Sequence, residues 1–245
     1  MRLIVTEDYA ALSHIGADML AEIITARPEA TIVPATGDTP MGIYAELAAR
    51  RERGELDASR LRVFQLDEYL GIGAGDPRSL YGWLLRSFVG PLGIPESNVV
   101  RLRGDVEDVA SACAAYERAV DEAGGFDLAI LGLGPNGHLG FNEPPSEPGA
   151  PTRAVDLTEA SLQSNARYWG GRHQVPHGAV TAGMSRLLSA RQALLVVSGA
   201  HKSDILRRTV SGPPTPEVPS SLLQRAADVT VLADRAAWPF GPLPA

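Results

Sequence analysis

Short runs of apolar residues alternate along the chain with longer segments in which apolar residues recur every three or four positions. The runs are typical of buried strands, and the longer segments are typical of amphipathic helices. Strands are expected at residues 2–6, 31–36, 62–66, 98–102, 128–133, 177–183, 192–198 and 229–234. Helices are expected at 7–26, 40–48, 79–88, 106–123, 157–169, 203–210 and 220–224.

This alternation predicts an α/β fold of three α/β/α layers, with a Rossmann-like, mostly parallel sheet that helices cover on both faces. No linker or internal repeat interrupts the pattern, so residues 1–245 are expected to form a single domain. Residues 144–156 are rich in Pro, Gly and Ser and are expected to form a loop. The Pro-rich tail from about Trp238 is expected to be loosely held.

Ligands of open parallel sheets bind beyond the carboxyl ends of the strands, so the residues that follow each strand matter most. Gly37, Asp38, Thr39 and Pro40 follow the second strand and lead into a helix. Thr39 suits the N-cap and Pro40 the first helical position, and the free N–H groups of a helix start attract anions. The turn has neither a P-loop nor a GxGxxG pattern, and a tightly capped helix is the alternative interpretation.

Acidic residues and one histidine follow two other strands. Asp67 and Glu68 are adjacent at the end of the third strand, and neighbouring side chains of an extended chain point to opposite sides. We therefore expect one to do chemistry and the other to cap or pair. His138 and Glu143 lie five residues apart beyond the strand at 128–133. An imidazole and a carboxylate at such a place can transfer protons, although a plain surface loop would have the same sequence.

Lys202 is the only lysine of the chain, and arginine supplies every other strongly basic side chain. It ends the turn Gly199–Lys202 between a strand and a helix, a second place suited to an anion. A compact ammonium and a planar guanidinium are not interchangeable at a tight site, so this lysine is a candidate ligand of an anionic group. The alternative is that Lys202 is an ordinary surface lysine, present by chance and without such a role.

Composition narrows the class of partner. The net charge of −7 argues against nucleic acid and anionic membranes, which both favour a basic surface. A single cysteine excludes an intrachain disulfide, and no Cys/His cluster has the spacing of a metal site. The chain shows no secretory signal and no apolar run of about 18 residues, so a cytoplasmic protein is expected.

Four segments together resemble the glucosamine-6-phosphate deaminases, which share a fold group with the 6-phosphogluconolactonases and ribose-5-phosphate isomerases. The segments are PATGDTPMGIY (34–44), FQLDEYLG (64–71), LGLGPNGHLGFNEP (131–144) and SGAHKSDIL (198–206). They occur in the order and spacing of that family, over residues 30 to 234 or so. The GFNEP and DEY elements differ from the corresponding motifs of the lactonases.

The resemblance implies a role for each matching residue. The phosphate of the sugar is expected to bind the turn Gly37, Asp38, Thr39 and Pro40 together with two basic residues, Arg167 and Lys202. The segment 157–169, which carries Arg167, is expected to be either a lid over the site or an ordinary surface helix.

The same resemblance implies the catalytic set. Asp67 corresponds to the carboxylate that moves a proton between C2 and C1 of the sugar. His138 corresponds to the residue that helps to open the sugar ring, with Glu143 beside it. Asn136 stands where some members have an aspartate that orients the histidine. An asparagine can hold the ring through a hydrogen bond but cannot stabilise an imidazolium as a carboxylate would.

The implied reaction converts D-glucosamine 6-phosphate into D-fructose 6-phosphate and ammonia, without a metal or redox cofactor. A lactonase, a deaminase of another amino-sugar phosphate and a non-catalytic sugar-phosphate sensor are the alternatives, and the epimer of the sugar stays open. The expected partner is therefore a small sugar phosphate, and relatives include both monomers and homo-oligomers. The presence of Asp67, His138 and Glu143 favours an enzyme over a sensor.

Some bacterial members of the family are activated by N-acetylglucosamine 6-phosphate through basic residues near the position of Arg153. Arg153 is present here, but Val155 stands where the family has a lysine. We expect weak or absent activation of this protein.

Overall fold

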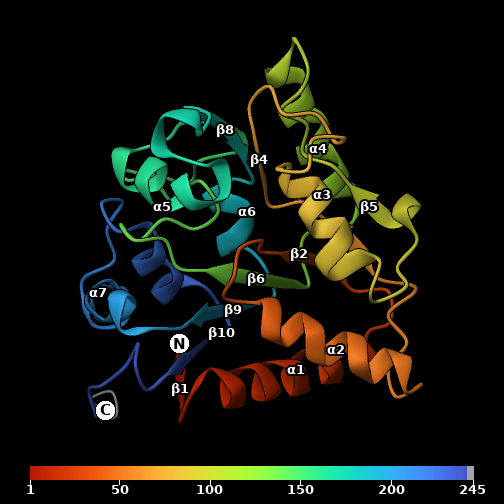
Figure 1. The fold of residues 1–245 in the computed structure, drawn as a ribbon, viewed down its shortest axis with the longest axis vertical. Coiled ribbons are helices and arrows are strands. Elements are labelled where there is room, and N and C mark those ends of the chain that lie inside the picture. Colours follow the sequence, from red (N-terminus) through yellow and green to blue (C-terminus); the bar gives the residue numbers. More distant parts are fainter. Residues whose placement is uncertain (242–245) are drawn as a thin grey trace.

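The computed structural model describes residues 1–241, so the last part of the predicted loose tail, 242–245, lies outside the described residues. Seven strands form one parallel sheet in the order β1-β10-β9-β6-β2-β3-β5 (Figure 1). These strands are β1 (Arg2–Thr6), β2 (Thr31–Pro34), β3 (Arg62–Phe64), β5 (Val99–Val100), β6 (Leu128–Gly132), β9 (Gln192–Val197) and β10 (Val229–Asp234).

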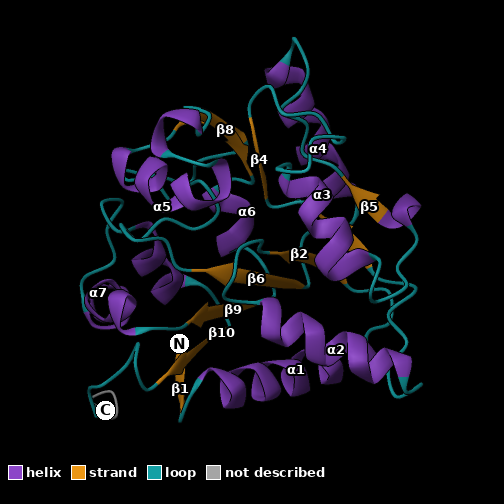
Figure 2. Cartoon of the chain, viewed as in Figure 1, coloured by secondary structure: helices purple, strands orange, loops and turns teal. Residues whose placement is uncertain are grey.

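Helices connect the strands, as the apolar periodicity predicts (Figure 2). They are α1 (Tyr9–Ala26), α2 (Met41–Glu52), α3 (Leu80–Leu84), α4 (Val109–Glu122), α5 (Glu159–Trp169), α6 (Met184–Leu188) and α7 (Ser203–Ser211). A π-helical turn, Leu85–Val89, extends α3, and short 3₁₀ turns lie at Glu96–Asn98, Arg172–Gln174, Ala200–Lys202 and Pro219–Arg225.

Side chains of successive strand residues enter two different cores, one on each face of the sheet. On β6, Leu128 and Ile130 pack against α1 and α2, whereas Ala129 and Leu131 pack against α4, α6 and α7. This is the alternation that a strand imposes, and it explains why the buried strands read as continuous apolar runs. The predicted three layers, with helices on both faces of a parallel sheet, are confirmed.

A second, three-stranded sheet in the order β4-β8-β7 was not predicted. Its strands are β4 (Asp67–Tyr69), β8 (Gly178–Thr181) and β7 (Arg153–Asp156), and all its pairings are antiparallel. The strand predicted at 177–183 is confirmed, but it pairs in this second sheet and not in the parallel one, and the loop predicted over 144–156 is wrong for its last four residues, which form β7. Both errors have one cause: pairing between strands far apart in sequence is invisible in local patterns.

The strand order places a topological switch point between β2 and β6. The chain moves from β2 through β3 to β5 in one direction, and from β6 through β9 to β10 in the other. In open α/β sheets a ligand crevice forms at such a point, outside the carboxyl ends of the strands. The turns that follow β2 and β6 carry candidate site residues, so the fold brings them to one place.

The start of the predicted loose tail is packed rather than loose. Ala237 and Trp238 are both buried in the core beside β10. The Trp238 indole donates a hydrogen bond to the carbonyl of Gly241 (2.9 Å). The prediction rested on the proline content of the segment and gave no weight to Trp238, whose large apolar side chain packs into the core.

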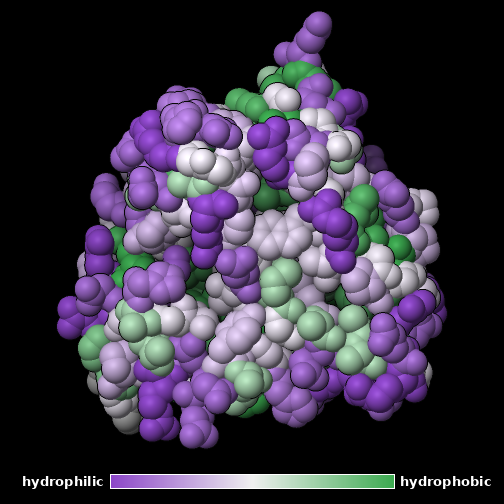
Figure 3. Space-filling view, viewed as in Figure 1, coloured by the Kyte–Doolittle hydropathy of each residue, from purple (hydrophilic) through white to green (hydrophobic). Residues whose placement is uncertain are grey.

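The surface drawn in Figure 3 is mainly hydrophilic, with hydrophobic residues interspersed. Among the described residues only four large apolar side chains are exposed: Met1, Val5, Tyr9 and Phe240. None of the helices within residues 1–241 has both the length and the apolar character to cross a membrane. The lone Cys113 is buried on α4.

Candidate functional site

A cavity of about 1000 Å³ lies at the switch point of the sheet. Its wall comes from the turns after β2, β6 and β9, the start of β4, and helices α3 and α5. Among its lining residues are most of those that the sequence singled out: Gly37, Asp38, Thr39, Pro40, Asp67, His138, Arg167 and Lys202. Asn136 and Glu143 stand behind this wall and contact the groups that form it.

The turn after β2 lines the cavity and leads into α2, but it is held differently from the prediction. Gly37 has a φ of +102° and open space where a side chain would be, so glycine is required by the backbone alone. Helix α2 begins after Pro40, and neither Thr39 nor Pro40 caps it with a side-chain hydrogen bond. The prediction of a Thr39 cap is wrong.

Tyr9 on α1, rather than Thr39, makes the side-chain hydrogen bond to the start of α2. Its phenol oxygen accepts a hydrogen bond from the backbone N–H of Gly42 (2.9 Å) and lies 3.1 Å from the Thr39 carbonyl, to which it can donate. One free N–H of the helix start is thus already used, and the loop is tied to α1. The sequence analysis missed this residue because no local pattern connects positions so far apart.

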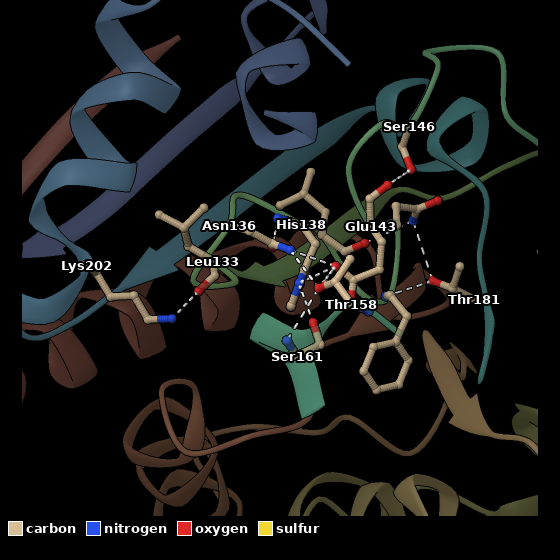
Figure 4. A network of polar contacts seen from close by, with 12 residues as sticks. Leu133, Asn136, His138, Glu143, Ser146, Thr158, Ser161, Thr181 and Lys202 are labelled. Carbon is tan, nitrogen blue, oxygen red and sulfur yellow. Dashed lines mark hydrogen bonds and ion pairs between the residues drawn. The ribbon is translucent and has the colours of Figure 1, made fainter. Parts of the chain in front are cut away.

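The basic residues lie on two other elements of the same cavity. Arg167, on α5, forms an ion pair with the Asp38 carboxylate (2.9 Å) and donates to the Tyr168 hydroxyl (2.6 Å). Lys202 donates to the backbone carbonyl of Leu133 (2.7 Å; Figure 4). Burial, and to a lesser degree the nearby charge of Arg167, lowers the pKa of Lys202 to about 8.

The corner that presents Lys202 is fixed from the neighbouring strand. Asp234, at the end of β10, accepts hydrogen bonds from the Ser198 hydroxyl and from the backbone N–H of Gly199. Gly199 has a φ of +94°, a conformation that favours glycine. The corner is therefore rigid, and the lysine extends from it into the cavity.

Asp67 is a buried carboxyl group with almost no hydrogen-bond partners. Its side chain is only 6% exposed, and its Oδ1 atom has no hydrogen-bond partner among residues 1–241. Burial, and secondarily the charge of Glu68, raises the pKa of Asp67 to about 8. A carboxyl group that lies in a cavity with a pKa near neutrality is suited to take up and return a proton.

Glu68 has the opposite environment, as expected for two adjacent residues of a strand. Its carboxylate accepts hydrogen bonds from the Ser79 hydroxyl (2.8 Å) and from the backbone N–H groups of Leu80 and Tyr81 (3.0 Å each). These donors form the N-terminus of α3, where a negative charge is stabilising. The prediction that one of the two carboxylates caps or pairs is confirmed for Glu68, and the chemical role of Asp67 stays a prediction.

His138 and Glu143 lie together, as the sequence predicts. Figure 4 shows their side chains converging with those of Asn136, Thr158 and Ser161. The distance from His138 Nδ1 to Glu143 Oε2 is 3.4 Å, and that from Nδ1 to the Ser161 hydroxyl oxygen is 3.2 Å. A side chain at Gly134 would collide with the imidazole, so glycine lets the ring pack against the backbone.

Asn136 makes no hydrogen bond to the imidazole ring, although an asparagine at this position could make one. Its side-chain amide donates to Glu143 Oε2 (2.8 Å) and to the Thr158 hydroxyl (3.1 Å). Its carbonyl oxygen accepts from the backbone N–H of His138 (3.2 Å). Asn136 therefore orients the loop and the glutamate rather than the ring.

Glu143 is surrounded by donors. Burial alone would favour its neutral form, but hydrogen bonds from His138, Ser161 and Asn136 and the charge of His138 outweigh burial and lower its pKa to about 2. The Thr158 hydroxyl, 3.0 Å from Oε2, adds another donor. An ionised carboxylate thus lies beside the histidine, behind the cavity wall, and a second carboxyl group, Asp67, which holds its proton, lines the cavity.

Thr158 and Ser161 were missed by the sequence analysis. Both lie at the start of α5, where Thr158 is the N-cap and accepts a hydrogen bond from the backbone N–H of Ser161. A threonine ahead of an amphipathic segment is a recognisable N-cap signal. Nothing local indicated that the same helix start would face His138.

Residues 1–241 contain no group of three or more His, Cys, Asp or Glu side chains that could hold a metal ion.

Comparison with known proteins connects this site to one family. The sequence profile described as "Glucosamine-6-phosphate isomerases/6-phosphogluconolactonase" matches residues 7–232. A glucosamine-6-phosphate deaminase of Streptomyces avermitilis is 41% identical over 97% of this chain and 91% of its own. One of Clostridium botulinum (strain Kyoto / Type A2) is 35% identical over 97% of both chains.

Comparison with solved structures points to the same family. A monomeric glucosamine-6-phosphate deaminase superposes with a TM-score of 0.94 at 35% identity, over 97% of this chain and 98% of the other. The 6-phosphogluconolactonase of Trypanosoma cruzi reaches a TM-score of 0.76 at 22% identity, over 96% of this chain and 95% of the other, which is a likeness of fold alone. The chain belongs to the family of glucosamine-6-phosphate isomerases and 6-phosphogluconolactonases.

Proposed function

We propose that this protein is a glucosamine-6-phosphate deaminase, which converts D-glucosamine 6-phosphate and water into D-fructose 6-phosphate and ammonia. The names of the relatives at 35% to 41% identity support this assignment. The observation that carries it is the pairing, in one cavity, of a buried carboxyl group with a pKa of about 8 and a histidine linked to an ionised glutamate. The lactonases match at lower identity.

The two basic residues and the glycine turn are proposed to bind the phosphate. Arg167 and Lys202 line the cavity together with Gly37, Thr39 and Pro40. The carboxylate of Asp38 would repel a phosphate dianion, so we assign it the task of holding Arg167 through their ion pair. Because the phosphate is remote from the reacting carbons, its binding can position the sugar for chemistry.

His138 is proposed to open the sugar ring. The imidazole takes the proton of the C1 hydroxyl group and returns it to the ring oxygen as the bond from C1 to that oxygen breaks, which leaves the open-chain aldehyde. Glu143 stays ionised beside the imidazole, with its Oε2 atom 3.4 Å from Nδ1. Asn136 keeps Glu143 in place.

Asp67 is proposed to move the proton between carbons. Its carboxylate removes the proton from C2 and returns it at C1, and water then hydrolyses the resulting imine and releases ammonia. In the empty cavity Asp67 is largely protonated at neutral pH, since its pKa is about 8. The positively charged amino group of the bound substrate favours the ionised form that the reaction needs.

Two broader assignments follow from the proposed substrate. We propose a cytoplasmic enzyme, because a phosphorylated sugar does not cross membranes unaided. We also propose that residues 1–245 act as one unit, because the cavity takes its wall from segments between Tyr9 and Lys202. A homo-oligomer stays a prediction, since one relative of known structure is monomeric.

The test is to incubate the purified protein with glucosamine 6-phosphate and to measure ammonia and fructose 6-phosphate beside the Asp67→Asn variant. We expect equal amounts of both products from the wild type and neither from the variant. A folded wild-type protein that releases no ammonia would refute the assignment. Galactosamine 6-phosphate and 6-phosphogluconolactone, assayed in parallel, would then identify the sugar or the reaction that replaces it.

A further inference from the structure

Gln65 is a buried glutamine at the point where the chain passes from the parallel sheet to the antiparallel one. It lies between the end of β3 at Phe64 and the start of β4 at Asp67, and it is only 1% exposed. The chemistry proposed above gives it no role. A buried amide needs partners for its N–H groups and for its oxygen, so its contacts show what it holds in place.

The side chain of Gln65 makes three hydrogen bonds. Its Nε2 atom donates to the backbone carbonyl of Asp67 (2.8 Å) and to the Glu68 carboxylate (3.1 Å). Its Oε1 atom accepts from the backbone N–H of Leu102 (3.1 Å), in the segment that follows β5. One side chain therefore links the start of β4 to a segment that is distant in sequence.

The backbone of Gln65 is itself held by two hydrogen bonds. Its N–H donates to the carbonyl of Val100 on β5 (3.0 Å), and its carbonyl accepts from the Tyr116 hydroxyl on α4 (2.8 Å). Tyr116 is fully packed in the core below the sheet, with its ring against that of Phe64. The amide thus extends from a fixed position, as a residue that supports a functional group must.

Strand β8 does not hold the backbone of Asp67, although β4 pairs with it. Asp67 lies opposite Thr181 in the antiparallel register. In the preceding pair, the N–H of Ala182 donates to the carbonyl of Leu66 (2.8 Å). Hydrogen-bonded and non-bonded pairs alternate along an antiparallel ladder, so the backbone N–H and carbonyl of Asp67 point away from β8. Gln65 supplies the hydrogen bond that the ladder does not.

The position of its backbone matters for Asp67, because few contacts fix its carboxyl group. The Oδ1 atom has no hydrogen-bond partner within residues 1–241. A side chain of this kind takes its place in the cavity from the main chain. Misplacing a reacting group by about 1 Å can slow a reaction about a hundredfold.

We propose that Gln65 is a positioning residue that holds the backbone of Asp67, and with it the carboxyl group, in the place where the group can reach the reacting carbons of the sugar. This inference deepens the proposed function, and its kinetic part rests on that function. Its effect on Asp67 itself can be measured without substrate.

The first variant is Gln65→Met, which removes the amide but keeps the length of the side chain. We expect kcat to fall about tenfold while KM stays within about twofold of wild type, because the proposed phosphate contacts lie on other elements.

Gln224→Met is the matched control. Gln224 also donates through Nε2 to two groups, the backbone carbonyls of Thr209 (2.7 Å) and Gly212 (2.9 Å). Losing these hydrogen bonds is expected to lower the free energy of unfolding, as in Gln65→Met, but to leave kcat and KM as in wild type.

A carbon-13 titration of the Asp67 carboxyl group separates positioning from a merely structural role. Burial is the main cause of the raised pKa of Asp67, about 8, so a backbone that moves and lets water reach the group lowers this pKa. We expect Asp67 to titrate at least about one pH unit lower in Gln65→Met than in wild type. In Gln224→Met it should titrate as in wild type.

Gln65→Asn is the second variant, and it serves if Gln65→Met does not fold. It keeps an amide, but one that is shorter by a methylene group and cannot reach the Leu102 N–H and the Asp67 carbonyl together. We expect both changes in the same direction and at smaller size, about threefold in kcat.

The proposal is overturned if Asp67 titrates as in wild type in a folded Gln65 variant, or if Gln224→Met shifts the titration equally. A rise in KM without a fall in kcat would also contradict it. A wild-type protein that releases no ammonia from glucosamine 6-phosphate would refute the proposed function alone. The titration would still decide whether Gln65 positions Asp67.

Discussion

Asp67 and Glu143 are two buried carboxyl groups of one site, and their environments drive them to opposite protonation states. Asp67 is 6% exposed and Glu143 is 7% exposed, so burial disfavours the charge on both. The pKa of Asp67 rises to about 8, whereas that of Glu143 falls to about 2. The difference comes from donors, because one Asp67 oxygen has none among residues 1–241 while Glu143 receives several.

This contrast shows which of the two carboxyl groups can take up and release a proton. A carboxylate whose lone pairs are occupied by donors is a fixed charge, because taking up a proton displaces a donor and weakens the remaining hydrogen bonds. A buried carboxyl group without donors favours its neutral form, so its pKa moves toward neutrality, where it can both give up and take up a proton. The burial of an acid therefore says little about its role until its hydrogen-bond partners are known.

The largest expected effect is on turnover. Asp67→Asn removes the proposed proton carrier, and we expect kcat to fall about a thousandfold or more with KM little changed. Glu143→Gln keeps the shape and part of the hydrogen bonding, so a smaller fall, of about ten- to a hundredfold, is expected. Steady-state kinetics of both variants tests this order. Equal losses would show that the two acids do not have separate roles.

The next effect is on substrate binding at the phosphate end of the cavity. Lys202→Met removes the charge but keeps the length of the side chain, and we expect KM to rise at least about tenfold with a smaller change in kcat. Because the pKa of Lys202 is about 8, the wild-type KM should also rise above that pH. Lys202→Met should lack this rise. A KM that depends on pH in the same way in both proteins would contradict the role of Lys202.

The same contrast predicts opposite effects of pH on stability. Unfolded Asp67 loses its proton near pH 4 and folded Asp67 near pH 8, so the folded wild type binds more protons in that window and loses stability as pH rises. Glu143 has a lowered pKa, so its stabilising contribution is present above about pH 4.5 and lost as pH falls toward 2.

Urea unfolding at pH 5 and pH 8.5 measures this difference. Relative to wild type, Asp67→Asn should gain on the order of 4 kcal/mol in free energy of unfolding between these two pH values. Glu143→Gln should be less stable than wild type by about 1 to 3 kcal/mol at both. If Asp67→Asn loses stability relative to wild type as pH rises, the raised pKa of Asp67 is wrong.

The smallest expected effect is on activation by N-acetylglucosamine 6-phosphate. The Arg153 guanidinium is already bonded to the Asn142 side chain (2.8 Å) and to the Ser146 hydroxyl (3.0 Å). Val155 adds no second cation. Adding the ligand should leave the half-saturating substrate concentration unchanged within about twofold. A large fall in that concentration would contradict this prediction.

Most of the fold and the position of the site could be predicted from the sequence. Apolar runs such as Leu128–Gly132 located the parallel strands, and turn residues such as Gly37 and Gly199 located the strand ends that meet at the switch point. The antiparallel sheet β4-β8-β7 escaped prediction because its strands are short and are defined only by distant partners.

Within the site, local patterns identified chemical groups but not their contacts. Asp67, His138 and Lys202 were found from their residue types at strand ends. The contacts of Tyr9 with the Gly37 turn and of Ser161 with His138 join segments that are far apart in sequence. The environment that separates Asp67 from Glu143 also arises from such contacts, so their different pKa values could not be predicted.

The most direct test of the central claim is a titration of Asp67 itself. Carbon-13 spectra of protein labelled at the aspartate carboxyl groups, recorded from pH 5 to pH 10 beside Asp67→Asn, would identify the Asp67 signal by its absence from the variant. The account predicts a carboxyl group that holds its proton at pH 6.5 and titrates near pH 8. A signal already ionised at pH 5 would show that Asp67 does not differ from Glu143, and the proposed division of roles would fail.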